Sequence, residues 1–471
     1  MGYGNPGGPP GGGITLDFQS SVLNINNVSR IMNFGATNGV ISNSSGNLLF
    51  ASNGCFIMNS NNDTMLNGSG LNPGTYTYFQ NNNNFGLDIP QGNLIIPFPG
   101  DSNKYYLFHE TSDDYGQTFC PLYLYYSVVD INLDGGLGEV TSKNIVLLND
   151  FLVQGKLNAC IHANGRDWWL IVHQYNSNLF YKYLITPNGI LGPDMQFIGE
   201  IRGNTSSNCS FSPDGNLFAY YDPYDGDLDL FDFDRCSGNL YSKTHVDIND
   251  SATLGGAAFS PNSQVLYISS QRYVYQFDVT SSNIANTMKT VATYDGYFSP
   301  YPPFSTLFFM PELAPDGKIY INSPSSVMDL HVINNPDSLG ASCNFCQHCI
   351  HLPAYNGFTI PNHPNYFLGP KAGTVCDSLS TNVLSHEKFE NALKLYPIPV
   401  IGNEITISYP VFPTQSELII NDILGREVFH KMLPAWSSVQ RLVIPALLNG
   451  IYSAKVKSEN GEGSITFIIS K

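Results

Sequence analysis

The sequence predicts an all-β protein, in which a β-propeller with seven expected blades is followed by a small immunoglobulin-like β-sandwich. Three observations support this fold class. Charged residues make up 13% of the 471 residues, about half the usual share, while aromatic residues also reach 13%. The chain contains 43 Gly and 30 Pro, as expected for many tight turns between short strands. The third observation is a repeated hairpin pattern.

This pattern is a turn rich in Pro, Asp, Asn and Gly, followed by a strand of alternating aromatic and β-branched residues. In the three clearest copies Asp214, Asn262 and Asp316 occupy equivalent turn positions, which gives steps of 48 and 54 residues. A period of about 40–50 residues with several strands per unit is typical of propeller blades. A β-sandwich array is the alternative. The six visible copies are 44–51, 99–108, 163–172, 211–220, 259–268 and 313–321.

The turn composition has a physical reason. Pro presets the first corner of the turn, Asp or Asn bonds to the local backbone, and Gly adopts the left-handed conformation. We expect a seventh blade from an N-terminal strand near residues 14–25 that pairs with strands after Ile350, because a closed ring leaves no sheet edge free. Residues 385–393 are the one helix candidate.

Composition shifts divide the chain into four parts. We expect a disordered Gly/Pro-rich segment at 1–13, the propeller at 14–370, a linker at 371–390 and the sandwich at 391–471. The first residues lack the basic and apolar regions of a signal peptide, so we expect a truncated start or a mature form. No apolar run approaches the roughly 18 residues of a membrane helix.

The net charge of −17 disfavours nucleic acid as a ligand. Proteins that follow a phosphate backbone need clustered Lys and Arg, because counterion release drives their binding. The chain has 21 Lys and Arg against 38 Asp and Glu, with no cluster of five basic residues. Its partners are therefore expected among glycans or other proteins.

The C-terminal part resembles the type A sorting domain of the bacterial type IX secretion system. That family usually has Tyr-Pro-Asn-Pro, where this chain has Ile398 at the third position. The resemblance implies that the type IX machinery recognises residues 391–471, that the protein is secreted or anchored on the outer-membrane surface, and that the domain is then removed. The motifs are LYPIP at 395–399, ELIINDILGREV at 417–428, NGIYSAKV at 449–456 and GSITFIISK at 463–471.

The front part resembles a family of surface propellers from bacteria that use this secretion route. The resemblance covers most of residues 30–380 and implies no particular activity. The matching motifs are NLLF at 47–50, MLNG at 65–68, HANGRDWW at 162–169, FDFDRCSG at 231–238, GASCNF at 340–345 and the stretch 369–379.

Nine cysteines are present, and in an exported chain most of them should be oxidised. We predict a disulfide between Cys209 and Cys236. We predict a second disulfide between Cys376 and one member of a cysteine cluster that consists of Cys343, Cys346 and Cys349. The spacing of the cluster, beside His348 and His351, is also compatible with zinc or an iron–sulfur centre. Because nine is odd, at least one thiol lacks an intramolecular partner.

The best candidate for a ligand site is a cluster of His162, Arg166, Asp167, Trp168 and Trp169. An Arg, a His and two indoles could stack on a sugar ring. Packing between blades is the alternative interpretation, and we favour it.

An Asp-rich segment offers a weaker alternative for calcium, with Asp222, Asp225, Asp227 and Asp229 as ligands. It lacks EF-hand spacing, so a solvated turn is the favoured interpretation. We expect no metal and no cofactor.

No nucleophile elbow, phosphate-binding loop or His-Glu-x-x-His motif occurs. We therefore expect a non-enzymatic binding or adhesion module. The alternatives are an extracellular glycan hydrolase or lyase with its site in the propeller channel, and a structural component of a surface layer or filament. An enzyme should bring Asp, Glu, His or Arg side chains together at the channel, whereas a binding protein should expose aromatic side chains on one face.

Overall fold

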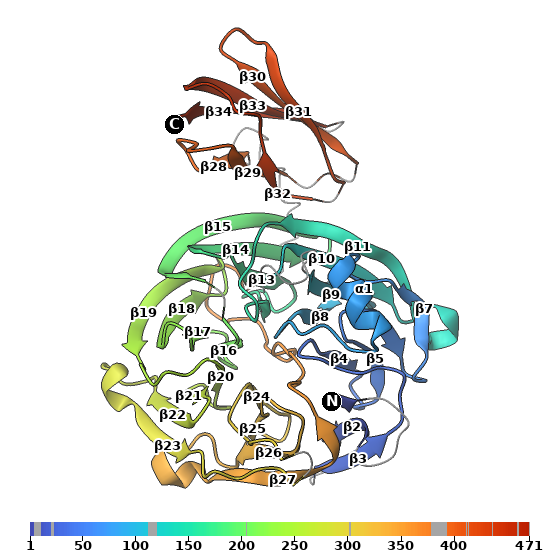
Figure 1. Ribbon diagram of the computed structural model, residues 1–471, viewed down its shortest axis with the longest axis vertical. Coiled ribbons are helices and arrows are strands. Elements are labelled where there is room, and N and C mark those ends of the chain that lie inside the picture. Colours follow the sequence, from blue (N-terminus) through green and yellow to red (C-terminus); the bar gives the residue numbers. More distant parts are fainter. Residues whose placement is uncertain are drawn as a thin grey trace.

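The architecture is a ring of β-sheets with a separate β-sandwich beside it, as Figure 1 shows. The predicted fold class, an all-β propeller followed by a small sandwich, is confirmed. The computed structural model describes residues 1–3, 11–19, 23–111, 120–203, 205–300, 303–377, 393–410, 412, 414–435, 437–458 and 461–470.

Within each sheet of the ring, successive strands pair in antiparallel fashion and follow one another in sequence order. The second and third sheets are also joined by one parallel bridge, between Leu66 and Glu139. The first sheet has three strands: β1 (Gly2–Tyr3), β2 (Gly12–Asp17) and β3 (Asn24–Val28). The second and third are β4 (Gly39–Ser42), β5 (Leu48–Ser52), β6 (Phe56–Asn59), β7 (Thr64–Ser69), and β8 (Asn93–Phe98), β9 (Asp101–Thr111), β10 (Tyr123–Asp130), β11 (Glu139–Asn149).

Four more sheets of four strands complete the ring. They are β12 (Asn158–Ile161), β13 (Trp168–His173), β14 (Ser177–Thr186), β15 (Gly189–Arg202); β16 (Cys209–Phe211), β17 (Leu217–Asp222), β18 (Asp227–Asp234), β19 (Asn239–Asp247); β20 (Gly255–Phe259), β21 (Val265–Ser270), β22 (Tyr273–Asp278), β23 (Lys289–Thr293); and β24 (Pro311–Leu313), β25 (Ile319–Ile321), β26 (Val327–Ile333), β27 (Phe345–Asn356).

The repeated sequence pattern corresponds to the first hairpin of each four-stranded sheet, such as β16–β17. Side-chain hydrogen bonds and a left-handed glycine stabilise its turn, as the composition predicts. Ser212 Oγ donates to Asp214 Oδ1 at 2.6 Å, and Gly215 has a φ of 70°. A side chain at Gly215 would come within 2.7 Å of Leu368, so the glycine also permits close packing. The first strand of each hairpin lies innermost in the ring (Figure 1).

Apolar side chains from neighbouring sheets pack against one another and form the core of the ring. One such cluster joins β17 and β18 to β20, β21 and β22, through residues including Leu230, Ala257 and Ile268, all fully buried. The alternation of side chains along each strand makes this possible, because one face of a sheet meets the sheet before it and the other face meets the sheet after it.

The N-terminal strands differ from expectation. β1, β2 and β3 form a sheet of their own that packs against β27, and they do not pair with strands after Ile350. The predicted shared sheet is wrong because β27 continues to Asn356 as the fourth strand of the preceding sheet. Disorder at residues 1–13 is also corrected for Gly2–Tyr3 and for Gly12, which lie in strands; residues 4–10 are outside the described residues.

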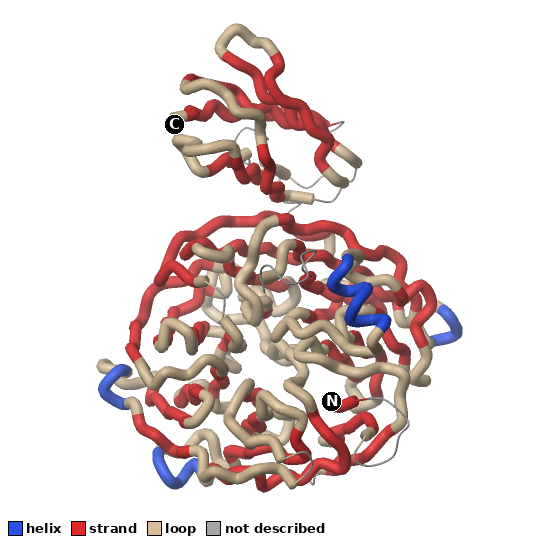
Figure 2. The backbone as a smooth tube through the Cα atoms, viewed as in Figure 1, coloured by secondary structure: helices blue, strands red, loops and turns tan. Residues whose placement is uncertain are grey.

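Helical structure is sparse, as Figure 2 shows. α1 (Thr75–Asn82) lies in the connection from β7 to β8, and short 3-10 turns occur at η1 (Asp134–Gly136), η2 (Ala285–Thr287) and η3 (Gly340–Cys343). The helix expected at 385–393 falls almost wholly outside the described residues. Among the described residues, no helix is long and apolar enough to cross a membrane.

The C-terminal unit consists of two facing sheets around an apolar core that includes Leu418, Ile420 and Val456. One sheet contains β28 (Lys394–Tyr396), β29 (Glu404–Ser408) and β32 (Val439–Val443). The other contains β31 (Glu427–Leu433), β30 (Ser416–Asp422), β33 (Gly450–Ser458) and β34 (Gly461–Ile469). β32 pairs in parallel with the end of β11, so the sandwich joins the outer edge of the ring (Figure 1).

Two disulfides are present among the described residues, Cys236–Cys376 and Cys346–Cys349. The predicted Cys209–Cys236 bridge is wrong, because Cys209 lies on the innermost strand β16 while Cys236 lies in the turn between β18 and β19. The predicted link between the cysteine cluster and Cys376 is wrong as well. Cys209 and Cys343 are buried free thiols, and burial raises the pKa of Cys209 to about 12.

The predicted domain boundaries stay a prediction. One feature bears on the linker expected at 371–390: the Cys236–Cys376 disulfide attaches its beginning to the ring.

Candidate functional site

The axis of the ring is occupied by the chain itself. Residues 357–371, here called the axial segment, follow β27 and contact the innermost strands of several sheets in turn. Near its start, Asn38 Nδ2 donates to Thr359 Oγ1 at 2.9 Å. Asn362 Nδ2 then donates to the carbonyl oxygens of Asn93 and Leu157, both at 3.1 Å.

The second half of the axial segment reaches the opposite side of the ring. Tyr366 Oη donates to Ile95 O at 2.8 Å, and Asn365 Nδ2 donates to Pro213 O at 2.7 Å in the turn that follows β16. Arg235 donates to Gly369 O at 2.6 Å. The axial segment therefore passes through the channel from one face to the other, and any channel site must include its side chains.

Two titratable residues come together along this path. Glu312 lies on β24, the innermost strand of its sheet, and its carboxylate accepts a hydrogen bond from the backbone N–H of His363. The ring of His363 lies 6.2 Å from that of Tyr366, measured between centroids. We call Glu312 and His363 the axial pair.

The axial pair is deep in the ring and still reachable by solvent. His363 is exposed and Glu312 is half-buried, yet burial raises the pKa of Glu312 well above its usual value and lowers that of His363 to about 4. A side chain that borders a solvent-accessible space enclosed by protein can be exposed and still have a pKa that the surrounding protein shifts. Burial thus favours the protonated carboxylic acid at Glu312 and the neutral imidazole at His363.

An acid and a base side by side can catalyse the cleavage of a polar bond. A protonated carboxyl can give a proton to a leaving oxygen, and a neutral imidazole can accept one from water. Carboxylic acids that act in this way have pKa values raised by burial. Burial shifts the pKa of each residue of the axial pair in the direction that such chemistry requires.

Sequence reasoning missed Glu312, although the repeats contain a signal for it. Counted back from the proline of each turn, Glu312 stands where Ser210 and Ala258 stand in the two preceding copies. A carboxyl group in place of a small side chain on an innermost strand could have been noticed. His363 carries no such signal, because no repeat predicts that the chain returns to the axis.

The predicted ligand cluster lies mainly within the packing between sheets. Trp168 is 3% exposed and Trp169 7%, and Trp169 Nε1 donates to Arg235 O at 3.0 Å. Arg166 Nε pairs with Asp167 Oδ1 at 2.7 Å. His162 Nε2 bonds to the backbone oxygen of Cys236, at 3.0 Å. Ligand binding here stays a prediction, and the burial of both indoles favours packing.

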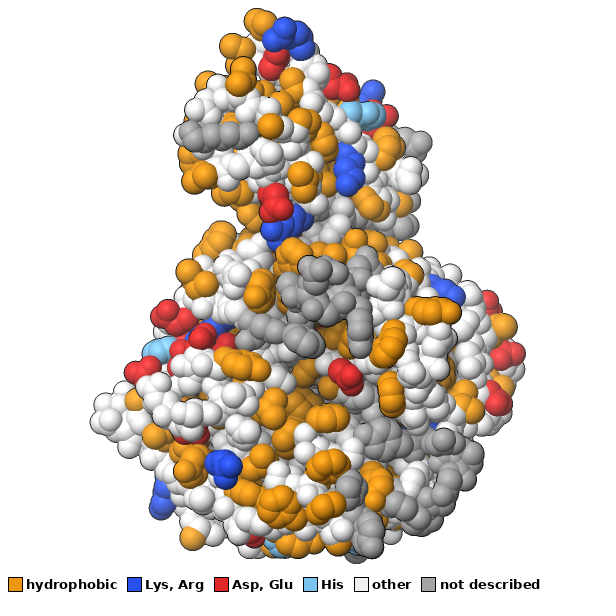
Figure 3. Space-filling model, viewed as in Figure 1, with side chains coloured by type: hydrophobic (Ala, Val, Ile, Leu, Met, Phe, Trp, Pro, Cys, Tyr) orange, Lys and Arg blue, Asp and Glu red, His pale blue; other side chains and the backbone are white. Residues whose placement is uncertain are grey.

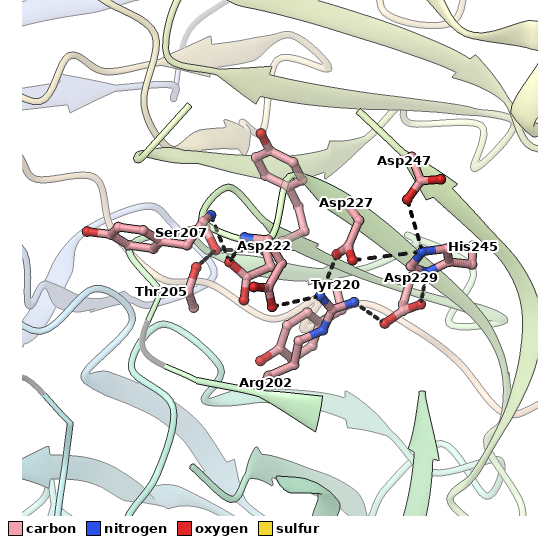
Figure 4. Close-up of polar contacts among 12 residues, drawn as sticks. Arg202, Thr205, Ser207, Tyr220, Asp222, Asp227, Asp229, His245 and Asp247 are labelled. Atoms are coloured by element: carbon pink, nitrogen blue, oxygen red, sulfur yellow. Dashed lines mark hydrogen bonds and ion pairs between the residues drawn. The ribbon is translucent and has the colours of Figure 1, made fainter. Parts of the chain in front are cut away.

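The Asp-rich segment surrounds an arginine (Figure 4). The guanidinium of Arg202, on β15, is 3.3 Å from Asp225, 2.5 Å from Asp227 and 2.5 Å from Asp229. Arg202 is 1% exposed. Three of the four carboxylates that the sequence suggested as calcium ligands therefore neutralise the buried guanidinium of Arg202, which comes from the neighbouring sheet.

The fourth carboxylate, Asp222, receives the backbone N–H of Tyr224 at 2.9 Å. Close by, the buried Lys156 donates to Ser207 Oγ at 2.7 Å, and burial lowers the pKa of Lys156 to about 8.

At the outer side of the cluster, His245 Nδ1 lies 2.8 Å from Asp229 Oδ1, and this hydrogen bond raises the pKa of His245 (Figure 4). The gap beside Arg202 has no room for a water molecule. This cluster joins two sheets.

Within the described parts of the chain, no group of three or more His, Cys, Asp or Glu side chains is arranged to hold a metal ion. The cysteine cluster, offered as a zinc or iron–sulfur alternative, has two of its thiols joined as Cys346–Cys349. His348 contacts Asp295 instead, at 3.0 Å, and His351 contacts Asp329 at 3.2 Å.

The comparison with protein families concerns the C-terminal sandwich. Residues 394–470 match the secretion system C-terminal sorting domain. The chain ends in a type IX sorting domain. This domain marks the protein for secretion to the cell surface or the extracellular space, and the type IX machinery handles it. No curated protein matches the sequence.

Solved structures resemble the ring at low sequence identity. The periplasmic gluconolactonase of Pseudomonas aeruginosa is 10% identical, with 73% of this chain and 96% of that chain covered and a TM-score of 0.33. A gluconolactonase from Xanthomonas campestris is 12% identical, with 69% and 94% covered and a TM-score of 0.33. A candidate 6-phosphogluconolactonase from Bacteroides fragilis is 13% identical, with 68% and 96% covered and a TM-score of 0.35.

The expectation that the chain is not an enzyme is corrected. It rested on the lack of familiar catalytic motifs, and the solved structures similar to this chain include named gluconolactonases. Such motifs are local in sequence, whereas a propeller site is assembled from different sheets. At these TM-scores the likeness assigns no reaction to this chain.

Proposed function

We propose that the exported propeller is an extracellular hydrolase that acts on glycan at the axis of the ring. The observation that carries the proposal is the contact of the Glu312 carboxylate with the backbone of His363 inside the ring, where both residues are partly or fully exposed to solvent. The sequence predicts that an enzyme would gather acidic and basic residues at the channel, and Glu312 and His363 are such residues.

The proposed reaction cleaves a C–O bond of the substrate. His363, as a neutral imidazole, accepts a proton from water while the water oxygen bonds to the carbon. Glu312, as a carboxylic acid, gives its proton to the leaving oxygen while the C–O bond breaks. Water is consumed, and two protonated products result; the axial pair recovers its starting state by passing the proton from His363 to Glu312.

The direction of substrate entry follows from amide bridges at one end of the channel. Asn208 Nδ2 donates to Ala257 O at 3.1 Å, which links two innermost strands where they begin. Gln91 Nε2 donates to Cys209 O at 3.0 Å and to Asn362 Oδ1 at 3.1 Å. These side chains cross the channel on the side of α1, so we propose entry from the opposite face.

The test uses the full chain and variants of the axial pair. Glu312→Gln and His363→Asn are incubated with a panel of polysaccharides, and new reducing ends are counted. Each substitution is expected to lower the rate about 100-fold or more, in the range usual for an acid or base. The control is Asp63→Asn, which removes an exposed carboxylate in the turn between β6 and β7. Unchanged rates in both axial variants would contradict the proposal.

A binding or adhesion role is the second candidate. The observation that favours it is a set of exposed aromatic side chains on and near α1: Tyr78 at 71% exposure, Phe79 at 43% and Phe85 at 48%. Figure 3 shows hydrophobic side chains spread over the face of the ring that it draws. Retention of a glycan or glycoprotein without product release would support this role. Loss of retention when these rings are replaced by Ser would be the expected result.

A further inference from the structure

A pocket lies at the rim of the ring on the face that carries α1, apart from the axial pair. Three segments form it: the connection from β3 to β4, the connection from α1 to β8, and the start of the axial segment. Its volume is about 160 Å³. This volume corresponds to about five water molecules at about 30 Å³ each, which suits a compact head group. We call it the rim pocket; it is lined by Asn33, Phe34, Gly35, Phe85, Gly86, Asp88, Gly357 and Phe358.

Phenylalanine rings form much of its wall. Phe85 is 48% exposed and Phe358 is 41% exposed, whereas Phe34 is buried. Phe358 has a φ of 59°, a left-handed conformation that is uncommon for a bulky residue. Asn322 Nδ2 holds this backbone by donating to Phe358 O at 2.8 Å. Such conformations persist where the surroundings impose them, and they are found at binding sites.

Asp88 supplies the charge. Gln80 Nε2 donates to its Oδ2 at 2.8 Å, and the Asp88 backbone N–H donates to Tyr76 Oη at 3.1 Å. A side chain at Gly35 would come within 2.6 Å of Asp88 Oδ1, so the carboxylate is pressed against the backbone. None of the ion pairs formed by the described residues includes Asp88, and burial raises its pKa.

We propose that the rim pocket binds an organic cation, namely a compact ammonium head group that touches the exposed rings of Phe85 and Phe358 and the Asp88 carboxylate. Aromatic faces attract cations, and an ammonium group inside an aromatic enclosure is the strongest form of this contact. The cation would also give the carboxylate an oppositely charged partner, in addition to its hydrogen bonds from Gln80 and from the backbone of Ala36. The net charge of −17 favours the approach of cations.

A sugar fits this pocket less well. Sugar recognition combines ring stacking with several hydrogen-bond donors and acceptors. Here Asn33 Nδ2 already donates to Asn84 O at 2.5 Å, and Gln80 already donates to Asp88. The Asp88 carboxylate remains as the charged acceptor. The proposal is independent of hydrolysis at the axial pair, because the two sites share no side chain.

The decisive experiment compares two ligands of nearly the same shape on the unmodified full chain. Choline carries a quaternary ammonium, and 3,3-dimethyl-1-butanol has a carbon atom in place of its nitrogen. Calorimetry or ligand-observed NMR should show choline binding at least tenfold more tightly. Equal binding of the two would overturn the proposal, as would no binding of choline. Tighter binding of glucose than of choline would overturn it in favour of a sugar site.

Variants then locate the cation. Asp88→Asn keeps the shape of the side chain and should weaken choline binding at least tenfold, and Phe358→Ala should weaken it several-fold. Asp63→Asn removes the same charge from an exposed turn and should leave binding unchanged. Thermal unfolding of each variant checks that it folds. If Asp88→Asn folds and binds choline as the unmodified chain does, the proposal fails.

The pH dependence gives a second readout. Choline does not titrate, so its affinity should rise with pH as Asp88 ionises and should level off above the raised pKa of this carboxyl. The neighbouring Tyr76 and Cys55 have pKa values raised by burial to about 12, so they stay neutral. Arg30, which contacts the Phe34 ring, keeps its charge with a pKa of about 10. An affinity that is flat between pH 4 and 8 would contradict the assignment to Asp88.

Discussion

At the scale of single residues, the buried charge of Arg202 is stabilised by carboxylates that the sequence presents as a surface turn. The residue is 1% exposed and reaches Asp227 and Asp229 at 2.5 Å each. Buried ion pairs gain little over apolar packing, but removal of one partner leaves an uncompensated charge. The arrangement therefore makes the junction between two sheets sensitive to substitution.

We predict that Arg202→Met destabilises the ring by about 3–5 kcal/mol, because two buried carboxylates lose their cation. Urea unfolding measures the loss. Lys243→Met is the matched control, since Lys243 forms an exposed pair with Asp232 at 3.0 Å and should cost at most about 1 kcal/mol. Equal losses of stability in the two variants would show that Arg202 does not stabilise the junction between the two sheets.

His109 gives a second prediction at this scale. It is fully buried, it contacts Asn72 Oδ1 at 2.7 Å and Ser127 Oγ at 2.9 Å, and burial lowers its pKa to about 3. The unfolded chain binds a proton below about pH 6.5 while the folded chain does not, so His109 reduces stability as pH falls from about 6.5 toward 3.

His109→Gln should reduce the loss of stability between pH 7 and pH 4.5, by up to about 1.4 kcal/mol per pH unit below pH 6.5. Urea unfolding at the two pH values measures this, with the unmodified chain beside it. The variant is expected to be less stable at pH 7, where the packing around the ring changes. An unchanged difference between the two pH values would contradict the assigned pKa.

At the scale of elements, local turn chemistry explains what could be predicted. The hairpin at Asp214 is specified by residues within six positions of one another, so its existence and period follow from the sequence. The axial segment and the three-stranded N-terminal sheet could not be predicted in the same way. Their partners lie far away in sequence, as the bond from Asn38 to Thr359 illustrates, and no local pattern encodes them.

The cysteine pairing failed for the same reason. Cys209 and Cys236 are 27 residues apart and seemed to border one hairpin, but alternation along β16 and the length of β18 separate their side chains. The partner of Cys236 is Cys376, which comes close only because the axial segment returns to the far side of the ring. The axial pair depends on that same return, so Glu312 could be suspected from the repeats while His363 could not.

The two disulfides should differ in their effect on stability. Cys236–Cys376 closes a loop of 140 residues, and Cys346–Cys349 closes one of 3. On the chain-entropy model, the long loop contributes about 5 kcal/mol and the short loop much less. Unfolding of Cys236→Ser/Cys376→Ser and of Cys346→Ser/Cys349→Ser measures the difference. A larger loss for the short loop would show that strain or local packing dominates.

At the scale of the whole molecule, the sorting domain and the ring share a small, specific junction. Leu148 and Asn149 of β11 pair with Val439 and Gln440 of β32. Next to this pairing, the carboxylate of Asp150 accepts a hydrogen bond from Tyr181 Oη at 2.7 Å. The junction covers an edge strand that would otherwise offer unpaired backbone groups to other chains.

The last prediction concerns removal of the sorting domain. The domain follows Cys376, which is tied to the ring by its disulfide, and its first core residue is Leu393. A cut between these two residues frees the sandwich and keeps the axial segment attached. We therefore expect the extracellular protein to end between Cys376 and Leu393, and intact-mass spectrometry of protein from the medium or cell surface measures this end. Protein that retains Lys471 would contradict the prediction. Because the cut exposes the end of β11, the mature ring should also self-associate more than the full chain does, which sedimentation of the two forms can compare.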